Sequence, residues 1–470
     1  MRKIQFMALL AAFIGLVSCG KEHKKPNVIY VFADQWRAQS TGYAGDVNAR
    51  TPILDKLAQE GINFKNAVST CPSCTPYRAS LLTGMYSTTH GLLLNDILLD
   101  PESESMAKIY KKAGYNTAYW GKWHVGGPYR LGYISESNRQ GFDFWKVMEC
   151  THEYMDSWYF DGNDRNRKRW NGYDAHEQAK DLCKYISDHA NDENPFLAVL
   201  SWGPPHDPYF QVPEKYLDMY SDLTNIVLRE NVPEDYKDEA LKMLQGYYAH
   251  IAALDESMGW IIQQIKDSGI EENTILIFTS DHGDMVGSKG MKHKSNPWDE
   301  SIMVPFLLKY PDAVKEGRTI EMPIGTPDIL PTLLGLCEIN TDLKFEGSDF
   351  SDILLGNEDE FENAALITNP TKNVVKREFR GVRTSRYTYV EDLTGPWLLY
   401  DNEKDPYQFT NLIEQEGNDK LKAELKVKLT TALELANDEF LPEQDYLERF
   451  GLYITPGGYP PMNLEFDPNK

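Results

Sequence analysis

The sequence predicts an α/β fold, in which a large, mostly parallel or mixed central sheet lies between layers of helices and is followed by a small antiparallel sheet with one helix. Two observations predict the first part: short apolar runs alternate with amphipathic segments, and polar clusters directly follow several of the apolar runs. A change of pattern near residue 365 predicts the second part, because polar and apolar residues alternate beyond it.

Four short apolar runs, rich in Val, Ile, Leu and Phe, are expected to form buried strands. They span residues 27–33, 116–120, 195–202 and 273–279. Each run leads into a polar side chain that can take part in chemistry, and these are Asp34, His124, His206 and Asp281 in chain order. Because parallel sheets bind ligands beyond the carboxyl ends of their strands, we expect these four side chains to meet at one edge of the sheet.

The segments between the strands carry helix signals. The segment 51–61 has Thr51 before the first turn, Pro52 in it and Gly61 at its end. Further helices are expected at 106–112, 174–187, 247–265 and 326–336, and one is expected to start near residue 79. Beyond residue 365 we expect strands at 380–390 and 397–400, a turn at 401–406 and a helix at 420–437.

The N-terminus is typical of an exported lipoprotein. The apolar stretch from Met7 to Val17 follows two basic residues and is too short to span a bilayer. It ends in Leu16-Val17-Ser18-Cys19, which resembles a bacterial lipoprotein box, so we expect a lipid anchor at Cys19 and a location in the periplasm or at the outer membrane or cell surface. The alternative is ordinary cleavage that leaves Cys19 free.

The predicted domain organisation has four parts: a signal peptide at 1–18, a tether at 19–25, a catalytic α/β domain at 26–365 and a C-terminal α+β subdomain at 366–470. A formal net charge of −23 argues against nucleic acid as a partner. Such a charge also means that an anionic substrate would need a local cluster of cations or a metal.

The pair Cys71 and Cys74 has C-x-x-C spacing, which allows a disulfide, a metal clip or a nucleophile. A zinc site would need a second such pair, and the sequence has none. Arg78 follows Cys74 by four residues, close to a probable helix start, where an anion is favoured. The third reading therefore makes Cys74 the nucleophile.

Hard oxygen donors predict a divalent cation at the sheet edge. Asp34, Asp281 and also Asp284 can supply carboxylates, while Gln35 and His282 can add ligands. Carboxylates brought together repel unless a cation neutralises them, so Ca²⁺, or less favourably Mg²⁺, is implied. Five side chains could then surround a tetrahedral oxyanion; these are Arg78, Lys122, His124, His206 and Lys294.

The segment from Cys74 to Gly84, CTPYRASLLTG, resembles the signature of the formylglycine-dependent (type I) sulfatases of the alkaline phosphatase superfamily. Further segments resemble that family in the same order, and they are PNVIYVFADQ at 26–35, GKWH at 121–124, Pro205-His206, SDHG at 280–283, Lys294 and LYDNEKDPY at 399–407. The protein also resembles Bacteroides-type lipoprotein carbohydrate sulfatases.

The resemblance implies a role for each site residue. Cys74 would be oxidised by a formylglycine-generating maturation enzyme, and its hydrate would attack sulfur. Asp34, Gln35, Asp281 and His282 would hold calcium together with the side chain at position 74. Arg78 and Lys122 would bind the diol and the sulfate oxygens. His206 would give a proton to the leaving alcohol near Lys294, and His124 would be the base that releases sulfate.

Three functions stay open at this point. The first is hydrolysis of the sulfate ester of a carbohydrate, in glycan degradation. The second is hydrolysis of a phosphonate monoester or phosphodiester, because Gln35 and His282 make the site less negative than in many members. The third is a lipoprotein that binds sulfated glycans with Cys74 unconverted. The aromatic-rich insertion at 141–173 could contact a sugar, although packing is the commoner use of such residues.

Overall fold

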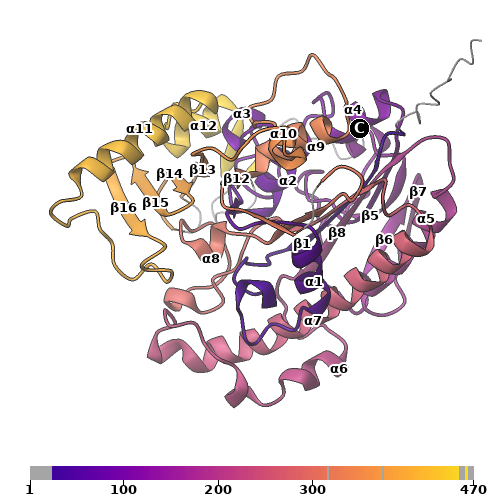
Figure 1. Ribbon diagram of the computed structural model, residues 1–470, viewed down its shortest axis with the longest axis horizontal. Coiled ribbons are helices and arrows are strands. Elements are labelled where there is room, and N and C mark those ends of the chain that lie inside the picture. The colour runs from indigo at the N-terminus through magenta and orange to yellow at the C-terminus, as the bar shows by residue number, and fades with distance from the viewer. Residues whose placement is uncertain (1–23, 315–316, 373–374, 455–460, 464–470) are drawn as a thin grey trace, which may run out of the picture.

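A ten-stranded mixed sheet forms the centre of the protein (Figure 1). The structure is a computed structural model that describes residues 24–314, 317–372, 375–454 and 461–463. The strand order is β11-β2-β10-β9-β1-β8-β4-β5-β6-β7. These strands are β1 (Asn27–Asp34), β2 (Ile62–Phe64), β4 (Asn116–Lys122), β5 (Phe144–Met148), β6 (Trp158–Asp161), β7 (Asp164–Arg169), β8 (Phe196–Pro205), β9 (Thr274–Ser280), β10 (Phe306–Lys309) and β11 (Arg318–Ile320).

The four predicted buried strands are β1, β4, β8 and β9, and they form the parallel middle of this sheet. Alternate residues of β1 face two different cores: Tyr30 and Phe32 lie in one, Ile29 and Val31 in the other. A strand buried on both faces has no polar side, which explains its unbroken apolar sequence. The mixed character comes from β10 and β6, which run antiparallel to both of their neighbours, and the predicted fold class is confirmed.

Helices cover both faces of the sheet. On one face α1 (Pro52–Glu60), α5 (Asp174–His189) and α7 (Lys237–Asp267) pack in the same core. On the other face lie α2 (Cys74–Thr83), α4 (Met106–Lys112) and α9 (Ile329–Leu336). The shorter helices are α3 (Ser87–His90), α6 (Glu214–Leu217), α8 (Asp299–Ile302) and α10 (Ser351–Leu355). A two-stranded sheet joins β3 (Ala67–Val68) to β12 (Ile324–Gly325).

The C-terminal part is an antiparallel sheet of β13 (Ala364–Asn369), β14 (Phe379–Thr384), β15 (Tyr387–Asp392) and β16 (Gly395–Asp401). Helices α11 (Asp419–Leu435) and α12 (Glu443–Arg449) lie beside it at the left of Figure 1. A small hairpin of β17 (Leu452–Ile454) and β18 (Pro461–Asn463) follows.

One predicted strand in this part is wrong. The segment 380–390 is not a single strand but belongs to β14 and β15, which are joined by a tight turn. The Thr384 hydroxyl accepts hydrogen bonds from the backbone N–H groups of Arg386 (3.3 Å) and Tyr387 (2.7 Å) and so stabilises the turn. The turn contains no Gly, Pro, Asn or Asp, the residues that most often mark a tight turn, so the sequence alone did not reveal it.

Several predictions remain outside what the structure tests. The signal peptide at 1–18 and the anchor at Cys19 lie outside the described residues. The boundary predicted after residue 365 falls within β13, and the division into domains stays a prediction. Among the described residues, no helix combines the length and the apolar character needed to cross a membrane.

A buried ion pair joins the C-terminal sheet to the central part of the protein. Arg383 on β14 donates to Asp299 at the start of α8 through Nε (3.1 Å) and Nη2 (3.0 Å), and Gln408 donates to the same carboxylate (3.1 Å). Both charged side chains are buried. The pair therefore holds the segment after β9, which carries site residues, against β14.

We expect Arg383→Ala to destabilise the protein by about 3–5 kcal/mol, because it leaves the Asp299 carboxylate buried without its cation. The double variant Arg383→Met with Asp299→Leu should lose less, since it removes both charges. Thermal unfolding midpoints of the three proteins check this, and equal losses in the single and the double variant would contradict it.

Candidate active site

The carboxyl ends of β1 and β9 meet at one edge of the central sheet. β1 ends at Asp34, and β9 ends at Ser280, directly before Asp281 and His282. The two strands pair in parallel with Ala33 opposite Ser280, so the residues that follow lie side by side. The register of two neighbouring strands therefore brings these polar residues together, as predicted.

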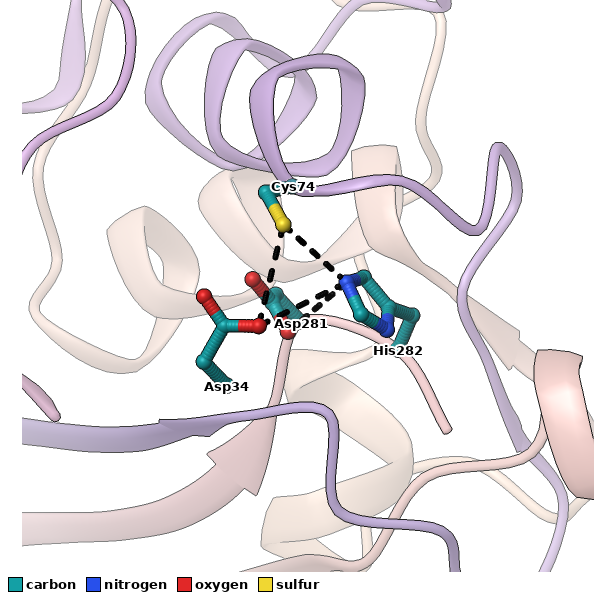
Figure 2. A group of neighbouring side chains, drawn as sticks. All are labelled: Asp34, Cys74, Asp281 and His282. Atoms are coloured by element: carbon teal, nitrogen blue, oxygen red, sulfur yellow. Dashed lines mark hydrogen bonds and ion pairs between the residues drawn. The ribbon is translucent and has the colours of Figure 1, made fainter. Parts of the chain in front are cut away.

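Cys74 faces this edge from the first residue of α2. Figure 2 shows its thiol pointing toward Asp34, Asp281 and His282. The sulfur is 3.2 Å from His282 Nε2 and 3.7 Å from Asp34 Oδ1. One donor atom from each of the four residues lies within 4.8 Å of the others, and all four side chains are buried.

This group of four residues fits a divalent cation. Its two carboxylates would repel each other strongly without positive charge between them. His282 Nδ1 lies 2.9 Å from the Gly283 carbonyl oxygen, so Nδ1 carries the proton and Nε2 presents its lone pair to the group. Carboxylate oxygens are ligands that calcium and magnesium prefer.

Gln35 and Asp284 lie next to this group. The Gln35 side-chain oxygen accepts a hydrogen bond from Lys294 Nζ (2.5 Å), and its Nε2 donates to Asp284 Oδ2 (2.8 Å). Asp284 also accepts from the Tyr209 hydroxyl (2.7 Å). The hydrogen bond with Asp284 thus fixes the orientation of the Gln35 amide. The role of Gln35 as a metal ligand stays a prediction.

Arg78 and Lys122 neutralise the two carboxylates. Arg78 lies one turn after Cys74 on α2, and its Nη2 is 3.3 Å from Asp34 Oδ2 and 3.1 Å from Asp281 Oδ2. Lys122 ends β4, and its Nζ lies 2.5 Å from Asp34 Oδ2 and 3.6 Å from Cys74 Sγ. Both cations are buried, so their charges are poorly screened by water.

Gly121 allows this placement of Lys122. It has a φ of +88°, and a Cβ there would lie 2.0 Å from the Ser201 carbonyl oxygen on β8. Only glycine fits so close to the neighbouring strand at this φ. Steric exclusion of any side chain therefore explains why glycine occupies the first position of the segment GKWH.

The surrounding charges favour the ionised form of Cys74. Burial and the nearby Asp34 carboxylate both act to raise the pKa of the thiol. The cationic side chains of Lys122 and Lys294, together with His282, outweigh them and hold that pKa well below its ordinary value. A side chain at position 74 is thus exposed to a field that stabilises negative charge.

A cavity of about 300 Å³ opens beside the thiol. Basic and imidazole side chains form most of its lining, which suits an anionic group. The lining residues are Ser73, Cys74, Asn95, Lys122, His124, Arg130, His152, His206, Asp207, His293, Lys294 and Ser295. The cavity therefore gathers the predicted cations except Arg78, which lies beneath it against the carboxylates.

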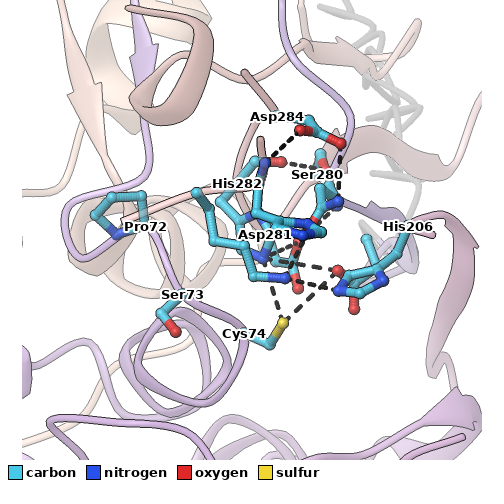
Figure 3. A network of polar contacts seen from close by, with 12 residues as sticks. Pro72, Ser73, Cys74, His206, Ser280, Asp281, His282 and Asp284 are labelled. Atoms are coloured by element: carbon cyan, nitrogen blue, oxygen red, sulfur yellow. Dashed lines mark hydrogen bonds and ion pairs between the residues drawn. The ribbon is translucent and has the colours of Figure 1, made fainter. Parts of the chain in front are cut away.

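His206 and Lys294 form a pair at the cavity wall. Lys294 Nζ lies 2.6 Å from His206 Nε2, while His206 Nδ1 lies 2.8 Å from the Asp207 carbonyl oxygen and carries a proton. Burial and the charge of Lys294 lower the pKa of His206 well below its ordinary value, so Lys294 holds the shared proton. Figure 3 shows His206 facing the same polar network as Cys74.

His124 lies in the cavity lining and is oriented by Asp96. Its Nε2 is 3.0 Å from Asp96 Oδ1, so the carboxylate accepts a proton from Nε2 and fixes the tautomer. Nδ1 is buried and has no well-aligned hydrogen-bond partner among the described residues. This nitrogen is the one left to exchange a proton.

Asp96 also binds a cation at the cavity mouth. Arg130 donates to both of its carboxylate oxygens, at 2.8 Å from Nε and 2.7 Å from Nη2. The Asp96 backbone N–H is 3.2 Å from the Thr75 hydroxyl, which itself donates to the His124 carbonyl oxygen (2.6 Å). Asp96 (φ +68°) and His124 (φ +57°) both adopt left-handed backbone conformations, a strain found at functional sites.

The sequence analysis missed Asn95, Asp96 and Arg130. They belong to no apolar run, and their spacing from the other site residues has no periodicity. Asn95 accepts hydrogen bonds from the Ser73 hydroxyl (3.0 Å) and the Thr75 backbone N–H (3.0 Å), so it fixes the turn that presents Cys74. Only the packing of this loop on α2 reveals these residues.

Two other features of the sequence turn out to be structural. Cys71 is a free, buried thiol whose pKa burial raises to about 11, and no described cysteine is in a disulfide. In the insertion at 141–173, large aromatic side chains are buried in the cores around β5 to β7, including Trp145, Trp158 and Phe160. These three rings therefore pack in the protein core, which is the alternative to contact with a sugar.

Two family models match the chain. One is described as Sulfatase and covers residues 26–339, and the other is described as N-sulphoglucosamine sulphohydrolase, C-terminal, and covers residues 287–434. The chain is 43% identical to an ulvan-active sulfatase of Formosa agariphila over 95% of this chain and 90% of that protein. It is 30% identical to an endo-4-O-sulfatase of Bacteroides thetaiotaomicron over 91% and 96%.

Solved structures agree with these matches. A structure from Bacteroides fragilis assigned as a sulfatase superposes with a TM-score of 0.84 at 28% identity, covering 92% of this chain and 99% of that chain. A phosphonate monoester hydrolase of Agrobacterium radiobacter gives a TM-score of 0.71 at 22% identity over 92% and 99%, a likeness of fold alone.

We expect Asp96→Asn to lower kcat by about 10²-fold, because an amide no longer fixes the tautomer in which His124 Nδ1 can take a proton. Burial lowers the pKa of His124, but Cys150 and the hydrogen bond with Asp96 raise it, and the pKa of His124 lies well above its ordinary value. Loss of the Asp96 carboxylate lowers that pKa, so neutral His124 persists to lower pH and the acidic limb of the pH–rate profile should move to lower pH.

The pH dependence of kcat for wild type and Asp96→Asn, measured under saturating substrate, checks this prediction. Asp100→Asn is the control, because Asp100 is an exposed carboxylate of the same segment that accepts a backbone N–H (2.9 Å). A pH profile that keeps its acidic limb in Asp96→Asn would show that Asp96 has only a structural role.

Proposed function

The chain belongs to the sulfatase family and is a sulfatase, and from this premise we propose that it removes sulfate from a carbohydrate by means of a formylglycine at position 74 and a calcium ion. The group of Asp34, Cys74, Asp281 and His282 carries this proposal, because a nucleophile position and a cation site share one buried cluster. The names of relatives active on ulvan or acting as an endo-4-O-sulfatase support a sulfated glycan as the substrate.

The conversion of Cys74 would improve the fit to a hard cation. A thiolate is a soft ligand, whereas calcium prefers oxygen. The chemistry that the formylglycine hydrate supplies is a hydroxyl nucleophile for sulfur and a second hydroxyl whose deprotonation lets sulfate leave. Bound calcium supplies positive charge that favours loss of a proton from the nucleophile and neutralises the sulfate oxygens.

The residues around position 74 divide the remaining work. Lys122 lies 3.6 Å from Cys74 Sγ, so its ammonium can hold an oxygen of the diol or of the sulfate. Arg78 keeps Asp34 and Asp281 ionised and in place through its two contacts. The carboxylates are thus available for the cation.

Two proton transfers remain, and the structure offers a group for each. The pair of Lys294 and His206 can give a proton to the leaving alcohol, with the proton held on Lys294 before reaction. His124 Nδ1 can take the proton from the second hydroxyl, because Asp96 holds the proton on Nε2. The proposed acid, Lys294 with His206, and the proposed base, His124, are therefore different groups of the cavity wall.

The export prediction extends this proposal. A lipid anchor at Cys19 would place the enzyme in the periplasm or at the outer membrane or cell surface, where it could meet extracellular glycans. A maturation enzyme would have to convert Cys74 before or during export.

We expect the peptide of residues 66–78 to be lighter by about 18 Da in the mature protein, because an aldehyde replaces the thiol of Cys74. Tryptic cleavage at Lys65 and Arg78 releases both Cys71 and Cys74 on this peptide. Tandem mass spectrometry after thiol alkylation should find Cys71 alkylated and Cys74 lighter. An alkylated Cys74 in an active preparation would contradict the proposal.

Cys74→Ala should abolish turnover of 4-nitrophenyl sulfate, and Cys71→Ser should retain it, because the buried Cys71 thiol contacts no group of the proposed mechanism. Comparison of 4-nitrophenyl sulfate with 4-nitrophenyl phosphate tests the ester preference. A higher kcat/KM for the phosphate would favour a phosphoester hydrolase.

Removal of calcium should lower both stability and activity. Without it, the Asp34 and Asp281 carboxylates keep only the charges of Arg78 and Lys122 beside them, and calcium at 100 times its Kd should stabilise the protein by about 2.7 kcal/mol. Thermal unfolding with EGTA, and again after adding Ca²⁺ or Mg²⁺, measures this. Asp281→Asn should reduce the calcium-dependent shift, and an unchanged unfolding midpoint in EGTA would exclude a structural calcium site.

A further inference from the structure

A second cavity is lined in part by the chain segment that also lines the catalytic cavity. Its volume is about 440 Å³. It is lined by residues of the segment before α8 and of the C-terminal sheet, namely Met291, Lys292, Asn296, Trp298, Val375, Arg377 and Trp397. None of these lining residues, all in the described part of the chain, is acidic, although the whole chain has a net charge of −23.

One segment of chain separates the two cavities. His293, Lys294 and Ser295 line the catalytic cavity, whereas the residues on either side of them line the second cavity. His293 (φ +62°) and Ser295 (φ +64°) have left-handed backbone conformations, which turn the chain so that neighbouring side chains face opposite ways. Lys294 and Asn296 are two residues apart, so their Cα atoms lie within about 7 Å of each other.

Hydrogen bonds fix this segment, which we call the dividing loop (residues 291–298). The Ser295 backbone N–H donates to the Pro72 carbonyl oxygen (3.0 Å), which ties the loop to the turn before Cys74. Asn296 is buried, donates through Nδ2 to the Lys294 carbonyl oxygen (3.0 Å) and through its backbone N–H to the Ser301 hydroxyl (3.1 Å). The two cavities therefore have a fixed relation to each other.

The second cavity has two half-buried tryptophan rings in its wall. The centroids of Trp298 and Trp397 are 6.4 Å apart and their planes meet at 71°. The Arg377 guanidinium lies 4.4 Å from the centroid of the Trp397 ring. By contrast, five tryptophans of the sheet cores are fully buried, so these two rings differ in being within reach of a ligand; the five are Trp36, Trp120, Trp123, Trp145 and Trp202.

Aromatic faces and cations together are suited to an anionic sugar. The apolar face of a pyranose ring can stack on tryptophan, and Lys292 and Arg377 can attract a sulfate or carboxylate group. Each of the two cations forms an ion pair that orients it, Lys292 with Glu239 and Arg377 with Asp392.

We propose that this second cavity binds a further, anionic sugar residue of the same glycan whose sulfate ester lies in the catalytic cavity. This inference rests on the proposed function and extends it: the enzyme acts on a chain that spans the dividing loop, and its efficiency depends on the length of that chain. Trp397 and Arg377 are specificity-determining residues that take no part in the reaction itself.

The test compares substrates that fill one cavity or both. The probes are 4-nitrophenyl sulfate and size-defined oligosaccharides, from monosaccharide to hexasaccharide, of ulvan, chondroitin sulfate and heparin. For the wild type, kcat/KM on a glycan that it desulfates should rise with length. Trp397→Ala should lower kcat/KM on the longer oligosaccharides by about 10-fold and leave 4-nitrophenyl sulfate within about 2-fold.

Trp260→Ala is the matched control, because Trp260 is another half-buried tryptophan but packs against His176 on α5. Arg377→Gln is a second test that keeps both tryptophan rings, and it should cause the same loss on longer chains. A thermal unfolding midpoint for each variant shows whether it is folded, and the turnover of 4-nitrophenyl sulfate provides an internal reference for each.

Three outcomes would overturn the inference: no dependence on length in the wild type, unchanged length dependence in both cavity variants, or an equal loss in Trp260→Ala. A wild type that hydrolyses 4-nitrophenyl sulfate but none of the three glycans would also overturn it, while the sulfatase function would stand. Absence of any sulfate ester hydrolysis by protein with converted Cys74 would instead contradict the proposed function.

Discussion

The mutual repulsion of two buried carboxylates is the constraint on which the site depends. Asp34 and Asp281 are brought together by the parallel pairing of β1 and β9, and neither has access to water. Arg78 and Lys122 offset part of their charge, and the group's geometry leaves room for a cation between them and Cys74. The same cations hold Cys74 in a field that favours negative charge, so one electrostatic arrangement would serve both the proposed metal and the proposed nucleophile.

The backbone strain near the catalytic cavity lies in the loops that follow the strands and helices. Left-handed backbone conformations occur at Gln35, Asp96, His124, His293 and Ser295, which all lie at or beside the catalytic cavity. The sheet and α2 hold these loops in place through hydrogen bonds such as that from the Ser295 backbone to Pro72. The dividing loop shows the consequence, because its two turns let one short segment serve two cavities.

Much of the fold and the centre of the site could be predicted from the sequence. β1, β4, β8 and β9 carry apolar residues on both faces because both faces are buried, and the polar residues after them must then lie at one edge. The hairpin of β14 and β15 was missed because its turn carries no Gly, Pro, Asn or Asp. Asp96 and Arg130 were missed because an irregular loop carries no periodic signal, and the second cavity joins residues about 80 to 100 positions apart.

The sequence by itself determined which segments form the buried strands, the polar residues that follow them, and the motifs of the family to which the chain belongs. These properties are local, since each depends on burial or spacing within a few residues. The tertiary structure alone decided which nitrogen of His124 is free, which nitrogen of His206 faces Lys294, how Gln35 is held, and that Trp298 and Trp397 share a cavity. Those facts depend on contacts between segments distant in the chain, and only the packing of the folded protein brings such segments together.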